Sequence, residues 1–382
     1  MKVKTVVLQE MMSKAIKGAG NDSQLPITML VSMKLVNGVL TLTTTDSSSN
    51  YLYVKQAGVE GEDMSVVVMI EQLAKLVAKM TSEYITLDNK KDYLEVNGNG
   101  TYKVEIQLDE NGEAVTYPDP YAEIDLETAK TIHEIKREDI QKILNTVKPA
   151  LAVTLESEYL TGYYVNQKEI IASNREVVSV YETNLIDDKI LIRADMMNLL
   201  DVITSKTFNV AIIEKSGVEE FDKIIFYSDD AVVYGYEMEG IEEWENPDPE
   251  REGSVPVVDI IQSFKDMDFP SVCKVSRNEL LQVLDRLSLF VSSYDKETIE
   301  VMFTKDSMNI KSIKGTGYEQ LKFVEAQNAD SFEMAIHITD LVEQVKAQSG
   351  DTVEICYGLD NLIKMRDGKV TQFIALCMLP ND

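Results

Sequence analysis

Basic side chains in this chain gather in segments with helical apolar periodicity, where lysines and arginines on one surface could contact a polyanion. The six segments are 6–19, 70–82, 136–150, 193–206, 276–291 and 337–349. They hold 13 basic and 10 acidic residues, whereas the rest of the sequence holds 24 basic and 55 acidic residues. Two interpretations stay open. Helices favour Lys and Arg as well as Glu, or the helices share one face that meets a polyanion.

The net charge by itself argues against nucleic acid as a partner. The 382 residues carry a formal charge of −28, and strong acidity favours solubility and repels phosphate. The distribution of the charge along the chain is therefore more informative than its sum.

The sequence predicts neither catalysis nor a metal or cofactor site. It contains no GxGxxG, GxxxxGK[ST], HExxH or GxSxG motif. With 65 acidic residues, some pair of carboxylates can always be found, so such a pair identifies no active site. His133 and His337 have no Cys or His neighbour at the spacing of zinc ligands.

The cysteines and the N-terminal segment favour a cytosolic protein. Cys273, Cys356 and Cys377 are scattered and form no CxxC pair, which argues against a disulfide framework. The first residues lack the apolar core of a signal peptide, and no stretch approaches the ~20 apolar residues of a membrane span.

The elements that must position the basic residues form a pattern that occurs three times. LPITMLVSMKLVNGVLTLTTTD at 25–46 alternates apolar and polar residues around Asn37-Gly38, a strong signal for a type I′ hairpin. An amphipathic helix precedes comparable strand-rich sequence at Leu8, Arg137 and Arg277. A strand that runs directly into a second amphipathic helix follows in each copy, from Met64, Lys189 and Phe332.

This repeat predicts an α+β architecture of three similar domains, each with two helices packed on antiparallel sheets. We place the domains at 1–130, 131–255 and 270–382. The acidic, Pro-containing stretch at about 240–269 is predicted to be a linker or insertion. It holds the only tryptophan, Trp244, which we expect to lie on its own domain rather than to dock a partner.

Several short motifs resemble the bacterial DNA polymerase III β subunits, the sliding clamps. LPI at 25–27, NGVLTLTTTD at 37–46, the strand–helix unit at 64–80 and YPDP at 117–120 are similar to the first clamp domain. YLTG at 159–162 and IIASN at 170–174 are similar to the second, and RNELLQVLDRLSLFVSS at 277–293 resembles the third. The order of these motifs along nearly the whole chain makes the resemblance specific.

The resemblance implies a head-to-tail homodimer that closes as a ring around double-stranded DNA without reading its sequence. Such a processivity factor tethers the replicative DNA polymerase, and a clamp loader and other proteins with clamp-binding motifs are implied as further partners. It implies no catalysis. A ring explains why the acidic chain needs no tight phosphate binding. The DNA-facing residues on the helices would be Lys14, Lys17, Lys75, Lys79, Arg137, Lys142, Lys148, Lys206, Arg277, Arg286 and Lys346.

The resemblance also implies a dimer interface and a partner-peptide groove. At the interface the edge strand TYKVEIQL would pair with the third domain of the other chain, with Tyr102 near Phe290 and Val291. The groove residues would be Leu160, Ser173, Val177, Val178, Leu376, Cys377, Met378 and Leu379.

Some positions depart from the family pattern. Ser173-Asn174-Arg175-Glu176-Val177-Val178 replaces the usual small-polar turn, and the chain ends in CMLPND, so we expect an altered peptide preference in a diverged clamp. The alternative is an acidic DNA mimic or a protein-binding scaffold without a ring, which predicts a monomer with acidic residues on every face.

Overall fold

The computed structural model describes residues 1–46, 50–109, 111–153, 155–217, 219–247, 255–291 and 297–378. Its contacts divide the chain into two compact units. Unit 1 is Met1–Ile140 with Ala194–Glu237, and unit 2 is Gln141–Arg193 with Met238–Asp382. Each unit is described by itself below.

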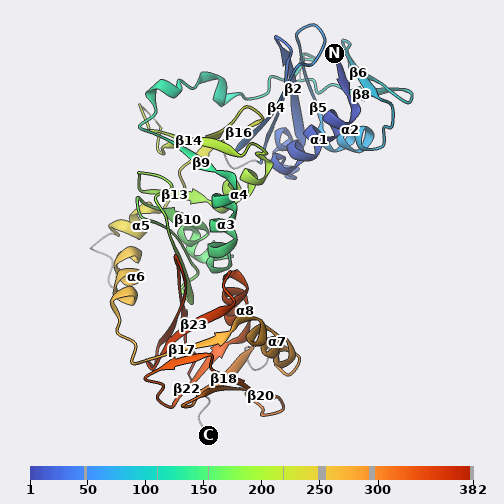
Figure 1. Ribbon diagram of the computed structural model, residues 1–382. Coiled ribbons are helices and arrows are strands. Elements are labelled where there is room, and N and C mark those ends of the chain that lie inside the picture. The colour runs from blue at the N-terminus through green and yellow to red at the C-terminus, as the bar shows by residue number, and fades with distance from the viewer. Residues whose placement is uncertain are drawn as a thin grey trace. The chain divides into compact units, whose positions relative to one another are not determined.

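Unit 1 contains two antiparallel sheets (Figure 1). The four-stranded sheet has the order β1 (Lys2–Lys4), β6 (Tyr84–Asn89), β7 (Tyr93–Asn97), β8 (Thr101–Glu105). The eight-stranded sheet has the order β5 (Met64–Met69), β2 (Leu30–Val36), β3 (Val39–Thr45), β4 (Tyr51–Ala57), β16 (Ala231–Tyr236), β15 (Lys223–Tyr227), β14 (Thr207–Ile213), β9 (Thr131–Lys136). Its helices are α1 (Thr5–Ala15), α2 (Ile70–Ala78) and α4 (Ala194–Leu199). The helix α3 (Arg137–Val147) begins here and continues into unit 2.

Unit 2 repeats this plan with a longer sheet. The nine-stranded sheet has the order β13 (Ile190–Arg193), β10 (Gly162–Val165), β11 (Glu169–Ser173), β12 (Val177–Glu182), β25 (Val370–Ala375), β24 (Leu362–Asp367), β23 (Thr352–Tyr357), β17 (Ser271–Ser276), β21 (Glu325–Gln327). The four-stranded sheet has the order β20 (Tyr318–Lys322), β19 (Ser307–Ser312), β18 (Thr298–Phe303), β22 (Phe332–His337). Its helices are α5 (Ile241–Glu245), α6 (Val257–Asp266), α7 (Arg277–Ser288) and α8 (Ile338–Ala347).

The local patterns of the sequence form the predicted elements. β2 and β3 pair as a hairpin in which Val36 faces Val39, and the two turn residues have φ of 51° at Asn37 and 76° at Gly38. Positive φ at both positions is what a type I′ turn requires, and Asn and Gly adopt it at low cost. The hairpin prediction is confirmed.

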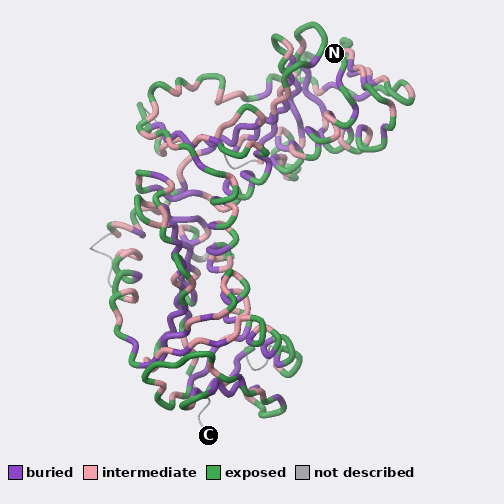
Figure 2. Tube along the Cα trace, in the orientation of Figure 1, coloured by how far each residue is buried: buried purple, intermediate pink, exposed green. Residues whose placement is uncertain are grey.

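Each strand–helix unit is also confirmed, because β5 runs into α2, β13 into α4 and β22 into α8 without an intervening loop. The helices bury one apolar stripe. In α1 this stripe includes Leu8, Met11 and Met12, while the opposite side is exposed. Figure 2 shows the same division across each unit, with buried residues along the strands and exposed residues on the outer helix faces.

The acidic stretch after β16 contains the helices α5 and α6, separated by 248–254, which lie outside the described residues. Trp244 is fully buried and stacks on Tyr164 with ring centroids 4.9 Å apart. Its Nε1–H donates to the carbonyl of Tyr159 at 2.9 Å. Trp244 thus packs on Tyr164 and Tyr159 of the same predicted domain, as expected.

The sheets join segments that the sequence assigns to different domains. β4 pairs with β16, and β12 pairs with β25. Because strands of neighbouring repeats pair in one sheet, the three sequence repeats pack into two compact units. The boundaries at 130, 255 and 270 therefore stay a prediction.

Candidate nucleic-acid interface and partner surfaces

In unit 1, α1 and α2 pack against each other and lie side by side (Figure 1). The apolar stripe of α1 packs on β3 and β4 of the eight-stranded sheet. At the end of α1, the Thr44 hydroxyl of β3 donates to the carbonyl of Ala15 at 3.0 Å. The basic side chains lie on the remaining helix surface, where Lys17 and Lys79 are exposed just beyond the two helix ends. Lys75 is also exposed, but its Nζ lies 2.5 Å from Glu71.

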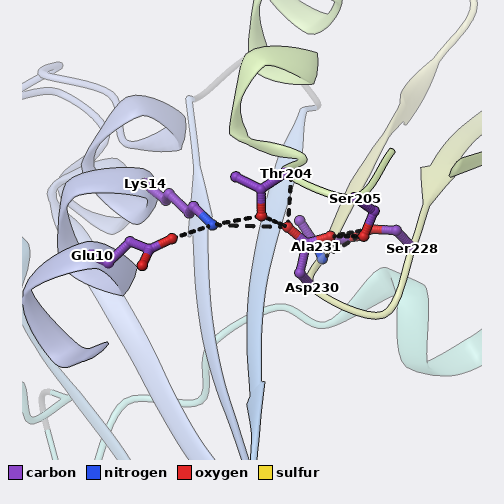
Figure 3. A network of polar contacts seen from close by, with 7 residues as sticks. All are labelled: Glu10, Lys14, Thr204, Ser205, Ser228, Asp230 and Ala231. Carbon is purple, nitrogen blue, oxygen red and sulfur yellow. Dashed lines mark hydrogen bonds and ion pairs between the residues drawn. The ribbon is translucent and has the colours of Figure 1, made fainter. Parts of the chain in front are cut away.

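Lys14 lies in a polar network rather than on open surface (Figure 3). Its Nζ is 2.9 Å from Glu10 and donates to Thr204 Oγ1 at 3.3 Å. The carboxylate of Asp230 lies 3.8 Å away, and only 15% of the Lys14 side chain is exposed. The network connects α1 to the 204–205 segment and to the β15–β16 turn. Lys14 therefore has a structural role in holding these segments together.

Asp230 is the centre of that network. Burial by itself raises the pKa of its carboxyl, but the hydrogen bonds from Ser205, Thr204 and Ser228 outweigh burial and hold the pKa well below its usual value. The carboxylate consequently stays charged at neutral pH and attracts Lys14.

Several basic residues of unit 2 are also engaged. Arg277 donates from Nε to the Val345 carbonyl at 2.9 Å and from Nη2 to the Lys346 carbonyl at 2.8 Å, which satisfies the C-terminus of α8. Arg286 forms a two-pronged ion pair with Glu319 at 2.7 and 3.1 Å. Lys346 Nζ lies 2.9 Å from Glu343. The charges of Arg286 and Lys346 are therefore partly neutralised by glutamates, and two donors of Arg277 are occupied by backbone carbonyls.

The candidates for phosphate contact thus differ in availability. Within the described part of the chain, four of them are exposed and form no ion pair: Lys17, Lys79, Lys142 and Lys206. Lys148 is exposed, and Arg137 is half-buried with its Nε enclosed. The helices α1 and α2 run antiparallel, because Gln9 near the start of α1 donates to the carbonyls of Val77 and Met80 at the end of α2. Lys17, beyond the end of α1, and Lys79, beyond the end of α2, therefore lie at opposite ends of the helix pair.

The four-stranded sheet of each unit has a terminal strand with exposed aromatic side chains on it or beside it. β8 is the last strand of its sheet, and Tyr102 on it is 42% exposed. In unit 2 this terminal strand is β20. Phe290 is 49% exposed beside Gly317, directly before that strand, and Val291 follows it half-buried. Tyr318 on β20 is 63% exposed, and no sequence motif singles it out, because its place on a terminal strand follows only from the sheet order.

The predicted groove residues are only partly brought together. Leu160 and Val178 belong to one buried cluster, which Trp244 and α6 cover. Ser173 and Val177 are also buried, but Val177 alternates with Val178 along β12 and faces the opposite side of the sheet. Val177 therefore cannot line the same surface as Val178. The cover that Trp244 and α6 form over Leu160 could not be read from the local sequence pattern.

The C-terminal part of the predicted groove follows β25. Leu376 and Cys377 are half-buried, and the Cys377 N–H donates to the Ala335 carbonyl at 2.8 Å. Met378 is 96% exposed, and Leu379 lies outside the described residues.

Burial raises the pKa of the Cys273 thiol to about 12 and also raises that of Cys356, so neither thiol is a ready nucleophile.

Two further features predicted from the sequence concern metal sites and membrane-spanning helices. In the described ranges, no set of three or more His, Cys, Asp or Glu side chains could hold a metal ion. None of the helices there combines the length and apolar character that a membrane crossing requires.

The backbone as a whole matches solved structures closely. The sliding clamp of Bacillus subtilis superposes with a TM-score of 0.81 at 14% identity and covers 99% of this chain and 98% of its own. The DNA polymerase III β subunit of Borrelia burgdorferi, solved with a natural product, gives 0.81 at 16% identity, with 99% of both chains covered. The β subunit of Thermotoga maritima gives 0.77 at 16% identity, again over 99% of both chains.

This chain has the fold of the bacterial sliding clamps. The α+β clamp fold predicted from the sequence motifs is therefore confirmed. The sequence has diverged far from these clamps: no protein-family model matches it, and no curated protein matches it in sequence. The clamp fold accounts for the repeated plan of helices backed by antiparallel sheets in both units.

Proposed function

We propose that this protein is a ring-shaped processivity factor of DNA replication. Two copies would close head to tail around double-stranded DNA in the cytosol and would tether the replicative polymerase to it. The observation that carries the proposal is the match to the Borrelia burgdorferi β subunit over 99% of both chains at a TM-score of 0.81. The proposal assigns the chain no catalytic step.

The open edges support ring closure. β8 pairs with β7 on one side only, and β20 pairs with β19 on one side only. On the other side of each strand, no further described strand of its own sheet pairs with the backbone N–H and C=O groups, and such edges pair readily. Joining β8 of one copy to β20 of the next is a heterologous contact, which closes into a ring when its rotation allows. Tyr102, Phe290 and Tyr318 would be covered by this contact.

The charge distribution supports a topological hold on DNA. Exposed lysines without an ion pair, such as Lys17 and Lys79, provide weak phosphate contacts that do not depend on base sequence. Since a closed ring cannot dissociate sideways from a duplex, a chain with a net charge of −28 needs no strong phosphate binding.

The partner proposal rests on the exposed end of the chain at Met378, since Leu160 and Val178 lie in a buried cluster. A clamp of Pseudomonas aeruginosa was solved with griselimycin bound, and its fold matches this chain with a TM-score of 0.80. We place the docking of polymerase and clamp-loader peptides near Met378, whose exposed, flexible side chain suits varied apolar ligands. Because Trp244 and α6 cover Leu160, an altered peptide preference is expected here.

The decisive experiment tests for a ring. The purified protein is sized by light scattering and is then incubated with nicked circular plasmid in the presence of clamp loader. Retention on the plasmid is measured by gel filtration before and after the plasmid is cut once. We expect a dimer that stays on the circle and is lost from the linear form. A monomer retained equally on both forms, or on neither, would instead favour an acidic scaffold or DNA mimic.

A further inference from the structure

A cavity of about 460 Å³ lies between the eight-stranded sheet of unit 1 and the 114–122 segment. Its floor is formed by β5, β2, β3 and β4 on the sheet face opposite to α1. Thr44 of β3 bonds to α1, so the alternating neighbours Thr41 and Thr43 face the cavity instead. A cavity of this size suits a small organic ligand.

The floor of the cavity consists of two rows of cross-strand neighbours. In the first row, Lys34 faces Thr41 across β2 and β3, and Thr41 faces Lys55 across β3 and β4. In the second row, Ser32 faces Thr43 in the same way. Two strand spacings place the backbones of Lys34 and Lys55 about 10 Å apart, with hydroxyls between and beside them.

Three hydroxyls of this floor, those of Ser32, Thr41 and Thr43, have no hydrogen-bond partner among the described residues. Ser32 and Thr43 are each only 6% exposed, yet no described residue forms a hydrogen bond with either hydroxyl. The same holds for the hydroxyl of Thr41, which is half-buried. These hydroxyl oxygens are not among the enclosed unpartnered atoms, so they open onto the cavity, where a ligand can reach them. A floor with several unpaired hydroxyls is therefore suited to a polar ligand.

The two lysines of the cavity differ in their partners. Lys34 Nζ is paired with the Asp119 carboxylate at 2.9 Å. Lys55 is half-buried, and its Nζ lies 5.1 Å from the centroid of the Tyr121 ring, with no hydrogen bond to any described residue. Burial lowers the pKa of the Lys55 ammonium, and only the longer-range charges of Asp229 and Asp119 oppose that effect. Lys55 is thus a desolvated cation without a hydrogen-bond acceptor.

We propose that this cavity binds a small molecule through one singly charged oxyanion group, a carboxylate or a phosphodiester. The Lys55 ammonium and the hydroxyls of Thr41 and Thr43 would donate hydrogen bonds to it. Asp119 and Asp229 repel further negative charge, which restricts the ligand to a single charge at this point. The inference stands apart from the DNA-binding function, because it concerns the sheet face that points away from α1.

The test uses acetate and dimethyl phosphate as probes of the two oxyanion types. Each is titrated into the full chain carrying 13C-methyl valine, and the signals of Val67, which lines the cavity, are followed. A Kd of about 1 mM is expected for the preferred probe, within reach of a ligand with few heavy atoms. A response to acetate alone assigns the site to carboxylates, and a response to dimethyl phosphate alone assigns it to phosphodiesters.

Two variants and a matched control decide the role of the named groups. Lys55→Met should weaken binding at least tenfold, and Thr43→Val should weaken it several-fold. In the control Lys2→Met, which removes another ammonium from above a tyrosine ring, binding should be unchanged; that ammonium lies 4.4 Å from the Tyr84 centroid. The melting temperature of each variant is measured to verify folding. The proposal is overturned if neither probe shifts the Val67 signals saturably, or if folded Lys55→Met binds as tightly as the natural chain.

Discussion

Replacing Asp230 with asparagine should loosen the junction between α1, the 204–205 segment and the β15–β16 turn. The carboxylate accepts hydrogen bonds at Oδ2 from N and Oγ1 of Thr204, at 2.7 and 2.5 Å. It accepts two more at Oδ1, from the hydroxyls of Ser205 and Ser228 at 2.5 and 2.7 Å. Asparagine has the same shape but no charge, and only its amide oxygen can accept. The two bonds from Thr204 can keep a neutral acceptor, whereas the amide nitrogen can only donate to the hydroxyls of Ser205 and Ser228.

The magnitude follows from the number of bonds and their exposure. A hydrogen bond to a charged group contributes about 1.5–3 kcal/mol and a neutral one about 1 kcal/mol, so neutralising all four costs about 2–8 kcal/mol before solvent screening. The Asp230 side chain is 24% exposed, and solvent screening reduces the effect. We therefore expect Asp230→Asn to lower the local free energy of opening by about 2 kcal/mol.

Hydrogen–deuterium exchange measures this loss where it occurs. Amide exchange in peptides covering 200–206 should accelerate about 30-fold, the factor that corresponds to 2 kcal/mol. The only tryptophan, Trp244, belongs to unit 2, so its fluorescence serves as an internal control and should not change. Lys14→Met removes the contacts of its ammonium with Glu10 and Thr204 as well as the 3.8 Å charge contact with Asp230, and it should cost less than about 1 kcal/mol.

The pH dependence provides a second test of the same reasoning. A folded-state pKa below the unfolded value of about 3.9 stabilises the fold fully above that pH, and this contribution is lost as the pH falls through the folded pKa. The difference between the natural chain and Asp230→Asn should be constant from about pH 5 to 8 and should shrink below about pH 4. Equal exchange rates for the two proteins at pH 7 would refute the role given to Asp230.

Three further predictions concern the proposed ring. Changing Lys17, Lys79, Lys142 and Lys206 together to Glu should reduce retention on nicked circular DNA at least about tenfold at moderate salt. The control variant makes the same change at four other exposed lysines, Lys90, Lys91, Lys168 and Lys305, and should keep normal retention. An equal loss in both variants would count against the assignment of the helices to DNA contact. Tyr102→Glu with Phe290→Glu should give folded chains with a light-scattering mass of 43.0 kDa, whereas Tyr84→Glu on the inner strand β6 should leave the dimer intact; a dimer that survives the double change excludes the proposed edges. Deleting residues 376–382 should abolish binding of polymerase-derived peptides in calorimetry while dimer and Trp244 fluorescence persist; unchanged affinity would place the groove elsewhere.

The sequence by itself determined the local elements and their threefold order. Asn37-Gly38 fixed a hairpin because its two residues tolerate positive φ, which is a property of the residues and not of their surroundings. The apolar stripe of α1 fixed which helix face is buried for the same kind of reason, since period alone decides which side chains share a face. Motifs in the right order along the chain then sufficed to predict the clamp fold.

Only the tertiary structure decided which of the candidate residues are free to act. Lys14 and Lys17 lie on one amphipathic segment and look equivalent in sequence, yet Lys14 reaches Thr204, 190 residues away, and Lys17 reaches no such partner in the described chain. The motif around Leu160 predicts a groove residue, but in the structure Leu160 is buried in one cluster with Trp244. The availability of a side chain depends on segments that are distant in sequence and adjacent in space, and periodicity carries no information about those segments.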